Sequence, residues 1–522
     1  MLDMSAPRNV LFITADQWRG DSLSAMGHPC LQTPNLDRLA ADGILFRRHF
    51  AQATPCGPSR ASLYTGMYLQ NHRSVVNGTP LDARHTNVAL EARKAGYDPA
   101  LFGYTDVSAD PRRHAPEDPA LRTYSSVLPG MTPVVQVDDH ALPWLADLKA
   151  KGYTGHDGIL EMYKPKDIGT EAIHRGLTFA PAEYSVEDSY SAFLTNELIK
   201  YLSVRLDRPW FAHLSYLAPH PPFIVPEPYH AMYDPIDVPR PVRAATVEGE
   251  AAQHPYLDYS LRNQSGWGIR YDHKSKNNLK LTDTDVLQAR ATYYGMMSEV
   301  DFHIGRLLEY LKEIGIYDNT LVVSTSDHGE QLGDHWQFAK YAYFDQSFHI
   351  PLIIRDPRAA AQPARGQQVD AFTENVDIMP TILDYLGVPI PIQCDGEVLT
   401  PYCHGETPPN WRTEAHWEFD FRRNIDANGN SALGLKPDQC GVNVIRGERY
   451  KYIHFTALPP LLFDLEEDPG EFRNLAEDPA SHPVILEYAQ KMLSWRMNHD
   501  ERVLANTLLT PEGVVEHLVP RR

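Results

Sequence analysis

The sequence predicts a layered α/β fold built around a large, mostly parallel sheet. Three observations support this prediction: short apolar runs of strand length recur along the chain, each run stops on polar residues, and stretches with helical periodicity separate the runs. The predicted strands with their polar ends cover residues 9–17, 98–106, 209–216, 320–326 and 350–354. Continuous apolar runs of this kind are typical of strands that helices cover on both faces.

The first hundred residues contain one strand and three helices. The first apolar run ends in Asp16 and Gln17. A helix begins after Thr33, which reads as an N-cap followed by a proline at the first helical position, and Gly43 is its expected stop. The stretch 54–66 is a proline-constrained turn followed by a helix, and residues 88–95 predict another helix.

The middle of the chain alternates between predicted elements and two irregular stretches. Residues 107–180 and 224–280 are rich in residues typical of loops, and we expect both to form insertions near the site. Between them, a helix over 189–202 leads into the strand 209–216. The prolines of the following loop present His220 on a rigid backbone.

The longest helical stretch covers residues 283–314, and its apolar stripe predicts a core-facing helix. The next strand, 320–326, ends in Asp327 and His328, and a helix over 376–386 is closed by Gly387.

After about residue 390 the pattern changes to short strands joined by tight turns, over 442–445, 450–455 and 461–465. A helix is expected over 483–495. We therefore expect three parts: an α/β domain that carries the site (1–390), an antiparallel β/α subdomain (391–485), and a helix with an extended C-terminal arm (486–522).

The composition limits the classes of partner. The formal net charge is −20, from 48 Lys and Arg against 68 Asp and Glu, so a nucleic acid would be repelled. There are five cysteines, Cys30, Cys56, Cys394, Cys403 and Cys440, without a Cys-x-x-Cys pair, which argues against a disulfide framework or a zinc knuckle. No apolar window of about 18 residues predicts a membrane span, and the first residues lack the apolar run of a signal peptide. The expected compartment is the cytoplasm.

The stretch around Cys56 has the features of an anion site. Cys56 lies between Pro55 and Pro58, and Arg60 follows four residues later. The start of a helix offers free N–H groups and a partial positive charge, and a guanidinium suits a tetrahedral oxyanion. The alternative is a buried structural cysteine, which is the usual place of a lone cysteine.

Polar residues that follow the predicted strands should meet at one edge of the sheet, where ligands bind in open α/β folds. These residues are Asp16, Gln17, Thr105, Asp106, His220, Asp327 and His328. A single divalent cation fits Asp16, Gln17, Asp327 and His328 together with an oxygen of residue 56. Carboxylate and amide oxygens suit Ca²⁺, Mg²⁺ or Mn²⁺, and the imidazole favours Mn²⁺.

The run from Cys56 to Gly66 also resembles the sulfatase signature, Cys-x-Pro-Ser-Arg followed by four residues and Thr-Gly. The resemblance extends from residue 9 to about 495 and points to the alkaline phosphatase superfamily. Within it, the chain is most similar to bacterial phosphonate monoester hydrolases, which also cleave phosphodiesters and accept sulfate esters. The stretches that carry this likeness are 96–101, 219–223, 327–335, 411–414 and 450–455.

The resemblance implies an alkaline-phosphatase-like α/β/α fold and a set of roles. Residue 56 would be oxidised to formylglycine, the nucleophile and a metal ligand, and the reaction would pass through a covalent intermediate on it. Asp16, Gln17, Asp327 and His328 would hold the metal, and Arg60 would steady the formylglycine hydrate. His220 and Lys340 would contact the oxyanion or protonate the leaving group. Asn77, Tyr104, Thr105 and Asp106 would line the substrate site.

Two positions depart from the pattern of the phosphonate hydrolases. Ser59 stands where they carry alanine, and Asp106 stands where they carry threonine. A carboxylate there could act as a base, at an electrostatic cost beside an anionic substrate. An arylsulfatase on the same scaffold therefore remains an alternative.

Two further alternatives are a two-metal phosphatase or phosphomutase, which would need a second ligand set such as Asp334, His335 and His220, and a binding protein with an inactive site. The expected partners are a small anionic ester, the enzyme that generates formylglycine, and further copies of the chain in a dimer or tetramer.

Overall fold

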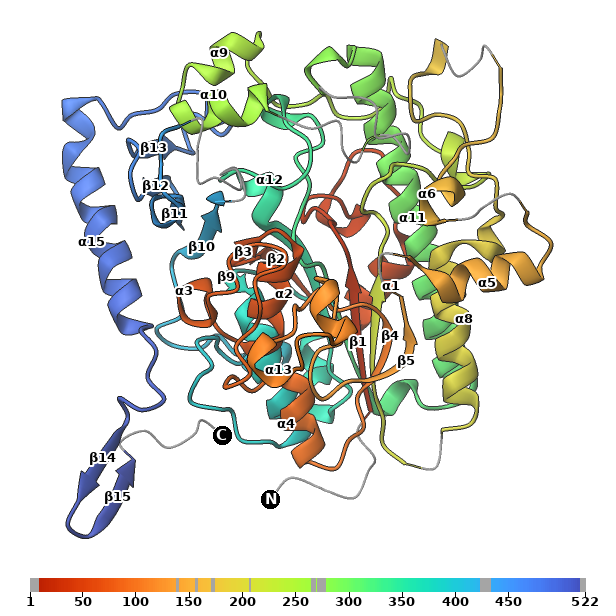
Figure 1. The fold of residues 1–522 in the computed structure, drawn as a ribbon, viewed down its shortest axis with the longest axis horizontal. Helices are drawn as coiled ribbons and strands as arrows, with labels where there is room; N and C mark the ends of the chain where they lie inside the picture. The colour runs from red at the N-terminus through yellow and green to blue at the C-terminus, as the bar shows by residue number, and fades with distance from the viewer. Residues whose placement is uncertain are drawn as a thin grey trace.

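The computed structural model describes residues 9–137, 140–154, 158–169, 174–205, 208–263, 269, 278–422 and 433–516. Its centre is an eight-stranded sheet in the order β5-β4-β6-β1-β7-β8-β2-β9 (Figure 1). The strands are β1 Asn9–Ala15, β2 Ile44–Phe50, β4 Ala100–Gly103, β5 Thr132–Gln136, β6 Phe211–Tyr216, β7 Thr320–Thr325, β8 His349–Arg355 and β9 Gln368–Glu374.

The middle of the sheet is parallel, as the apolar runs predict. β1 lies between β6 and β7 and pairs with both in parallel, with Val10 opposite Phe211 and Leu321. All seven residues of β1 are buried. β8 is the exception, because it runs antiparallel to both β7 and β2. The sheet is therefore mixed, although most of its neighbouring pairs are parallel.

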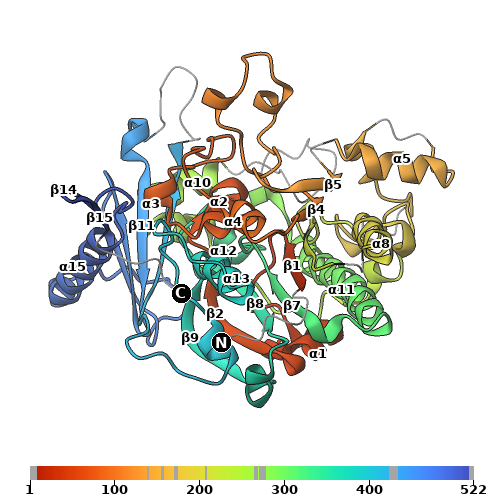
Figure 2. The same ribbon diagram turned by 90° about the horizontal axis from the view of Figure 1, so that it is seen from below.

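Helices cover both faces of the sheet (Figure 2). Leu11 and Ile13 of β1 share a core with α1 Pro34–Asp42, α8 Tyr190–Ser203 and α11 Asp283–Glu313. Val10 and Phe12 point to the opposite face and share a core with α2 Cys56–Thr65, α4 Val88–Lys94 and α13 Ile378–Leu386. This alternation along one strand produces three layers, helix, sheet and helix, and confirms the predicted fold class.

Several strands escape the sequence prediction, and each has a physical reason. β2 contains two arginines and a histidine, and β9 and β5 are edge strands with exposed polar or proline residues, so none reads as a continuous apolar run. The two insertions are also more ordered than their composition suggests. Residues 107–180 supply β5 and α5 Leu142–Ala150, and residues 224–280 contain α9 Val247–Ala251 and α10 Pro255–Arg262.

A second, five-stranded sheet has the order β13-β12-β11-β10-β3. It combines β10 Ala415–Asp420, β11 Gly441–Arg446, β12 Tyr450–Phe455 and β13 Leu461–Asp464, which are antiparallel, with β3 Ala53–Thr54, which is parallel to β10. α15 His482–Asn498 packs beside it through Tyr488 and Met492. β3 lies two residues before Cys56, so the small sheet supports the start of α2.

The chain then continues into a hairpin of β14 Thr507–Thr510 and β15 Gly513–Glu516, which projects from the body in Figure 1. The expected extended arm is thus partly a hairpin, and its last residues, 517–522, lie outside the described part. The limits of the three predicted parts remain predictions. Among the described helices, none has the length and apolar character needed to cross a membrane.

Candidate active site

Two strand ends and the start of a helix bring together four of the predicted metal ligands. Because β1 and β7 are adjacent and parallel, Asp16 and Asp327 leave the sheet at the same edge. α2 begins at Cys56 itself, without the preceding turn that the prolines suggested. Ligand atoms of Asp16, Cys56, Asp327 and His328 lie within 4.8 Å of one another, and all four residues are buried.

The imidazole of His328 is oriented for a metal. Its Nδ1 lies 3.0 Å from the carbonyl oxygen of Gly329 and donates a hydrogen to it. The lone pair of Nε2 therefore faces the cluster, 3.1 Å from Cys56 Sγ and 3.7 Å from Asp16 Oδ1. Burial lowers the pKa of His328, which keeps the ring neutral. A neutral histidine whose second nitrogen is held by a carbonyl is the usual form of a metal ligand, so the residues present fit a divalent cation.

The thiol of Cys56 is protonated in this environment. Burial and the charge of Asp16 raise the pKa of Cys56 well above its ordinary value. Because the thiolate is the reactive form of cysteine, a buried thiol with a raised pKa is a poor nucleophile. This agrees with Cys56 as the precursor of another group.

Arg60 ties the two strand ends together from inside the protein. Its Nε donates to Asp327 Oδ2 at 2.8 Å, and one terminal nitrogen donates to Asp16 Oδ2 at 3.2 Å. The other terminal nitrogen donates to Ser215 Oγ at 2.9 Å and to the Tyr104 carbonyl at 3.2 Å. The side chain has no solvent exposure. Arg60 thus positions the two carboxylates, and the contact with formylglycine that the resemblance implies stays a prediction.

Tyr104 joins the same network. Its hydroxyl donates to Asp16 Oδ2 at 2.6 Å, and its ring lies under the guanidinium of Arg60, 4.4 Å from the ring centre. Burial alone would raise the pKa of Asp16, but the histidines and cations around it outweigh burial and hold that pKa well below its usual range. Asp16 is therefore an ionised carboxylate, as a metal ligand must be.

Gln17 and Lys340 meet at the edge of the cluster. Gln17 has a φ of +68°, and its backbone N–H donates to Asp327 Oδ1 at 3.1 Å. Lys340 Nζ donates to Gln17 Oε1 at 2.6 Å. Burial would lower the pKa of Lys340, but the charges of the neighbouring carboxylates Asp16 and Asp327 raise it above the ordinary value. The structure therefore places a protonated, buried lysine beside the site, not on the surface.

His220 lies on the proline-rich loop after β6, as predicted. Its Nδ1 lies 2.7 Å from the carbonyl oxygen of Pro221 and donates to it, which leaves Nε2 as the acceptor in the neutral ring. Burial and the charge of Lys340 lower the pKa of His220 to about 4, while the charge of Asp16 opposes them. These interactions place His220 on the side of the site where Lys340 lies.

Asn77 and Asp106 close the site around the start of α2. Asn77 Oδ1 accepts the N–H of Gly57 at 2.8 Å. A side chain on Gly57 would come within 3.2 Å of both Asn77 and the Asp106 carbonyl, so glycine allows their close approach. Asp106 itself has a φ of +48°. Burial raises the pKa of Asp106 to about 7, against the lowering effect of Arg60.

Thr105 is the predicted substrate residue that the structure engages elsewhere. Its hydroxyl donates to the Ser126 carbonyl at 2.7 Å and accepts the N–H of Leu128 at 3.0 Å. These bonds attach the strand end to the insertion. The geometry therefore gives Thr105 a structural contact and no support for its predicted role.

Two residues that sequence reasoning missed complete the site. Ser215, the penultimate residue of β6, accepts a hydrogen bond from one terminal nitrogen of Arg60. Glu330, fully buried, accepts a hydrogen bond from the side chain of Gln17. The sequence signal that could have identified Glu330 is its place in the polar run after a predicted strand, directly after Asp327, His328 and Gly329.

A second ligand set for a two-metal centre does not form. Asp334 is bonded to Arg19 at 2.7 Å and to Arg290 at 3.1 Å, and His335 is bonded to Glu250 at 2.9 Å. Within the described ranges, the group around Cys56 is the one cluster of His, Cys, Asp and Glu with metal-ligand spacing.

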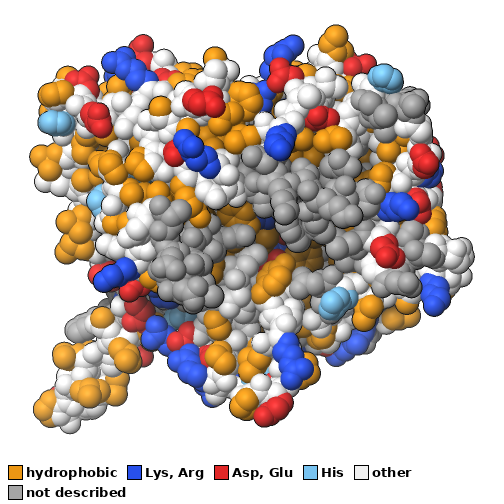
Figure 3. All heavy atoms as spheres, turned by 45° about the horizontal axis from the view of Figure 1, so that its top comes forward, with side chains coloured by type: hydrophobic (Ala, Val, Ile, Leu, Met, Phe, Trp, Pro, Cys, Tyr) orange, Lys and Arg blue, Asp and Glu red, His pale blue; other side chains and the backbone are white. Residues whose placement is uncertain are grey.

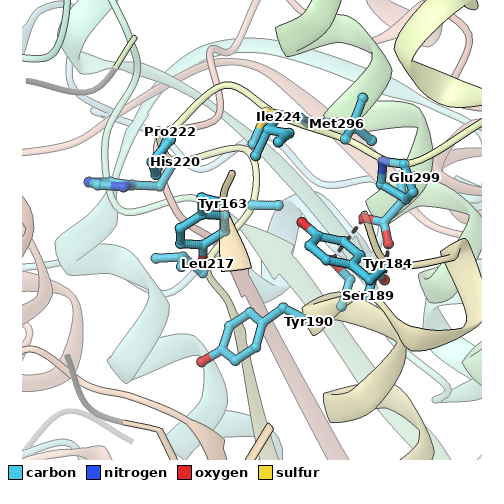
Figure 4. A pocket seen from close by; sticks show the side chains of 14 residues that line it. Tyr163, Tyr184, Ser189, Tyr190, Leu217, His220, Pro222, Ile224, Met296 and Glu299 are labelled. Carbon is cyan, nitrogen blue, oxygen red and sulfur yellow. Dashed lines mark hydrogen bonds between the residues drawn. The ribbon is translucent and has the colours of Figure 1, made fainter. Parts of the chain in front are cut away.

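The described residues on the face drawn in Figure 3 form no broad basic patch. On the face drawn in Figure 3, Lys and Arg are scattered among Asp and Glu. A small pocket lies beside the loop of His220 and is lined by Tyr163, Tyr184 and Glu299 among others, but the His220 ring points away from these side chains (Figure 4). The positive charge available to an anionic substrate is therefore local, from Arg60 and Lys340.

Comparisons with known proteins agree with this geometry. The family model described as Sulfatase matches residues 8–388, and the model described as N-sulphoglucosamine sulphohydrolase, C-terminal, matches residues 333–498. The chain is 42% identical over 516 residues to the multifunctional alkaline phosphatase superfamily protein PehA of Trinickia caryophylli, which covers 97% of this chain and 98% of that protein.

The chain is also 30% identical over 495 residues to an arylsulfatase of Clostridium perfringens, covering 93% of each chain. Among solved structures, the phosphonate monoester hydrolase of Agrobacterium radiobacter superimposes with a TM-score of 0.93 and 46% identity, over 99% of this chain and 100% of that chain.

Proposed function

The chain belongs to the sulfatase family and is an ester-bond hydrolase, and on this premise we propose that it hydrolyses phosphonate monoesters and phosphodiesters and also accepts sulfate esters. The observation that carries the proposal is the cluster of Asp16, Cys56, Asp327 and His328 within 4.8 Å. Two solved structures to which the chain is similar, at 46% and 40% identity, are phosphonate monoester hydrolases.

The donor set supports one divalent metal. Asp16, Gln17, Asp327 and His328 would hold it together with an oxygen of residue 56, and the mixture of oxygens and an imidazole favours Mn²⁺ over Ca²⁺ or Mg²⁺. When bound, the metal supplies a positive charge that acidifies a hydroxyl and offsets negative charge on the substrate.

Residue 56 would act as formylglycine, which a formylglycine-generating enzyme makes from Cys56 before turnover. The modified residue supplies the nucleophile. The chain's own residues then have separate tasks. Arg60 holds the carboxylates of Asp16 and Asp327 in place, and Lys340 presents a positive charge to the nonbridging oxygens of the ester.

His220 and Lys340 are the two side chains placed to give a proton to the leaving alcohol. Lys340 carries its proton at neutral pH, whereas His220 is neutral with Nε2 as an acceptor. An anionic ester beside His220 would raise the pKa of the imidazole and favour its protonated form. Asp106, with a pKa of about 7, is the nearby carboxyl that can accept a proton from residue 56 when the product is released.

The test of this proposal is Cys56→Ala. We expect turnover to fall by at least roughly 10⁴-fold, because the nucleophile is lost, while the circular dichroism and thermal unfolding stay those of the wild type. Cys403→Ala is the matched control, since Cys403 is equally buried but lies in α14 Thr400–Cys403, outside the site. Near-normal multiple turnover by Cys56→Ala would contradict the proposal, as would an unmodified cysteine mass at residue 56 in fully active protein.

The alternative activity is that of an arylsulfatase. The serine at position 59 favours it, since Ser59 is the residue of the sulfatase signature. Values of kcat/KM for a phenylphosphonate monoester, a phosphodiester and an aryl sulfate separate the two. We expect the phosphonate monoester or phosphodiester to be preferred, and a clear preference for the sulfate would assign the chain to the alternative.

We further propose that the chain works in the cytoplasm as a homodimer or homotetramer assembled through its C-terminal arm. In the hairpin, Leu508 pairs with Val515 on one face and Leu509 with Val514 on the other. All four are exposed, with Leu509 78% and Val514 65% accessible. An isolated two-stranded hairpin is marginal in water, so both apolar faces need cover. Light scattering tests this, and a monomer at micromolar concentration would contradict it.

A further inference from the structure

Glu330 is a buried carboxylate with three hydrogen-bond donors directed at it. Its Oε1 accepts the backbone N–H of Leu332 at 2.9 Å and of Ala339 at 2.5 Å. Its Oε2 accepts the side-chain NH₂ of Gln17. The residue has no solvent exposure. Burial raises the pKa of Glu330, and the three donors oppose that shift. A carboxylate can only accept, so all three contacts fit the ionised form of the side chain.

The two backbone contacts close the loop that carries Lys340. Leu332 and Ala339 both have a positive φ, +52° and +67°, which is unfavourable for residues other than glycine. Glu330 binds the N–H groups of these two residues, and Lys340 follows Ala339 directly. The carboxylate of Glu330 therefore sets the backbone position from which Lys340 reaches Gln17.

The side-chain contact fixes which end of the Gln17 amide faces the site. On one side, the Glu330 carboxylate only accepts hydrogen bonds; on the other, the Lys340 ammonium only donates them. One orientation of the amide satisfies both, with NH₂ toward Glu330 and Oε1 toward Lys340, as observed. In a flipped Gln17 amide, the NH₂ group would face the ammonium of Lys340, and the oxygen would face the carboxylate of Glu330.

We propose that Glu330 is a positioning residue of the metal site, which keeps Oε1 of Gln17 available as a ligand and fixes the backbone before Lys340. This inference rests on the proposed metal site. It assigns to Glu330 a role at two places at once, since loss of its charge would release both the amide of Gln17 and the loop of Lys340.

The experiment is Glu330→Gln, in which an NH₂ group replaces one oxygen. Because the backbone N–H groups of Leu332 and Ala339 still need an acceptor, the new NH₂ faces that of Gln17 and turns the Gln17 amide over. We expect the dissociation constant for Mn²⁺, measured by calorimetric titration of the metal-stripped full chain, to rise by roughly 10- to 100-fold. Glu299→Gln is the matched control: Glu299 is buried on α11 and accepts hydrogen bonds from Ser189 and Ser191, away from the cluster, so its Mn²⁺ affinity should equal that of the wild type.

The decisive arm is the exchange Gln17→Glu with Glu330→Gln. The carboxylate at 17 accepts from the amide at 330 and still offers an oxygen to the metal and to Lys340. We expect the double variant to bind Mn²⁺ at least roughly tenfold more tightly than Glu330→Gln. Gln17→Glu alone places the carboxylates of residues 17 and 330 against each other, so it should bind Mn²⁺ more weakly than the double variant does. This comparison tests the role of Glu330 even if Glu330→Gln does not fold.

Equal affinity of Glu330→Gln and the wild type, or no recovery in the double variant, would overturn the role of Glu330. A wild-type chain that binds no divalent metal would instead overturn the proposed function. The two failures are therefore distinguishable.

Discussion

The site has two halves that the protein holds in different ways. The strand-end half consists of Asp16, Cys56, Arg60, Asp327 and His328, and the loop half of Asn77, Asp106, His220 and Lys340. In the strand-end half, one side chain, that of Arg60, donates hydrogen bonds to both carboxylates, at 2.8 Å to Asp327 and at 3.2 Å to Asp16. In the loop half, His220 donates a hydrogen bond to the Pro221 carbonyl of its own loop, and Lys340 donates one to Gln17.

The difference indicates a division of tasks. The nucleophile and the metal need one geometry for every substrate, and adjacent parallel strands with a buried guanidinium provide it. The ester and its leaving group differ between substrates, and the residues of the loop half come from separate loops. Loss of a carboxylate or of Arg60 in the strand-end half should therefore remove stability and activity together, whereas changes in the loop half should alter how activity depends on substrate and pH.

The largest effect is expected for Asp327→Asn. The side chain at 327 accepts Arg60 Nε at 2.8 Å, and neither side chain is exposed. Loss of the charge leaves Arg60 underpaired in the interior, and the free energy of unfolding should fall by about 3 kcal/mol. Metal content should drop to background, and turnover by at least roughly 10³-fold. Urea denaturation and elemental analysis measure both.

Asp318→Asn is the matched control for this prediction. Asp318 pairs with buried Arg355 at 2.8 Å, but Asp318 itself is 92% exposed. Its loss should cost less than about 0.5 kcal/mol, since solvent screens the pair. If Asp327→Asn kept its metal and most of its stability, the strand-end half would not be the rigid part of the site.

The strand-end half is also the part that the sequence predicts. Each of its strands is an apolar run that stops on a polar pair, so Asp16 and Asp327 could be assigned to strand ends without any structure. Parallel neighbours then place those ends at one edge of the sheet. The sequence could not predict that Arg60 joins these two strand ends, because its contact with both carboxylates depends on where α2 packs against the sheet.

In the loop half, Asp106 and His220 follow predicted strands, whereas Asn77 and Lys340 could be predicted only through family resemblance. Lys340 reads from the sequence alone as a surface lysine, and its burial arises from a loop with a positive φ at Ala339. Thr105 shows that a polar residue at a strand end can serve the fold, here through Ser126 and Leu128, and its predicted role at the substrate stays a prediction. Tertiary contacts of long insertions leave no periodic signal in the sequence.

An intermediate effect is expected for His220→Ala. If the imidazole gives a proton to the leaving group, kcat/KM should fall by roughly 10²- to 10⁴-fold for an ester of an alkyl alcohol but only about tenfold for a nitrophenyl ester, whose alcohol leaves as a stable anion. Lys340→Ala should lower kcat/KM for both esters to a similar extent, because Lys340 acts through its charge.

His230→Ala serves as the control for His220→Ala. His230 lies in the adjoining insertion, 224–280, and packs against Phe179, with ring centres 5.4 Å apart. Both esters should keep wild-type rates in this variant. Equal losses for the two esters in His220→Ala would assign the proton to Lys340 instead.

The smallest effect on turnover and the clearest effect of pH are expected for Asp106→Asn. Asp106 has a pKa of about 7 in the folded chain and 3.8 as its ordinary value. Between these two pH values, Asp106 is deprotonated in the unfolded chain but still protonated in the folded chain. The contribution of Asp106 to stability is therefore complete below about pH 4 and is lost as the pH rises to about 7. The loss amounts to at most about 4 kcal/mol.

In metal-stripped protein, Asp106→Asn should therefore lose less stability between pH 4 and pH 8 than the wild type does. Thr105→Ala, one residue away, should lower stability by about 1 to 2 kcal/mol at every pH, because it breaks the bonds to Ser126 and Leu128 without removing a titrating group. Parallel pH curves for the wild type and Asp106→Asn would show that the pKa of Asp106 is not raised, so that its carboxylate is only a weak base at neutral pH. A flattened curve for Asp106→Asn beside a shifted but parallel one for Thr105→Ala would separate a titrating group of the site from a structural one within a single strand end.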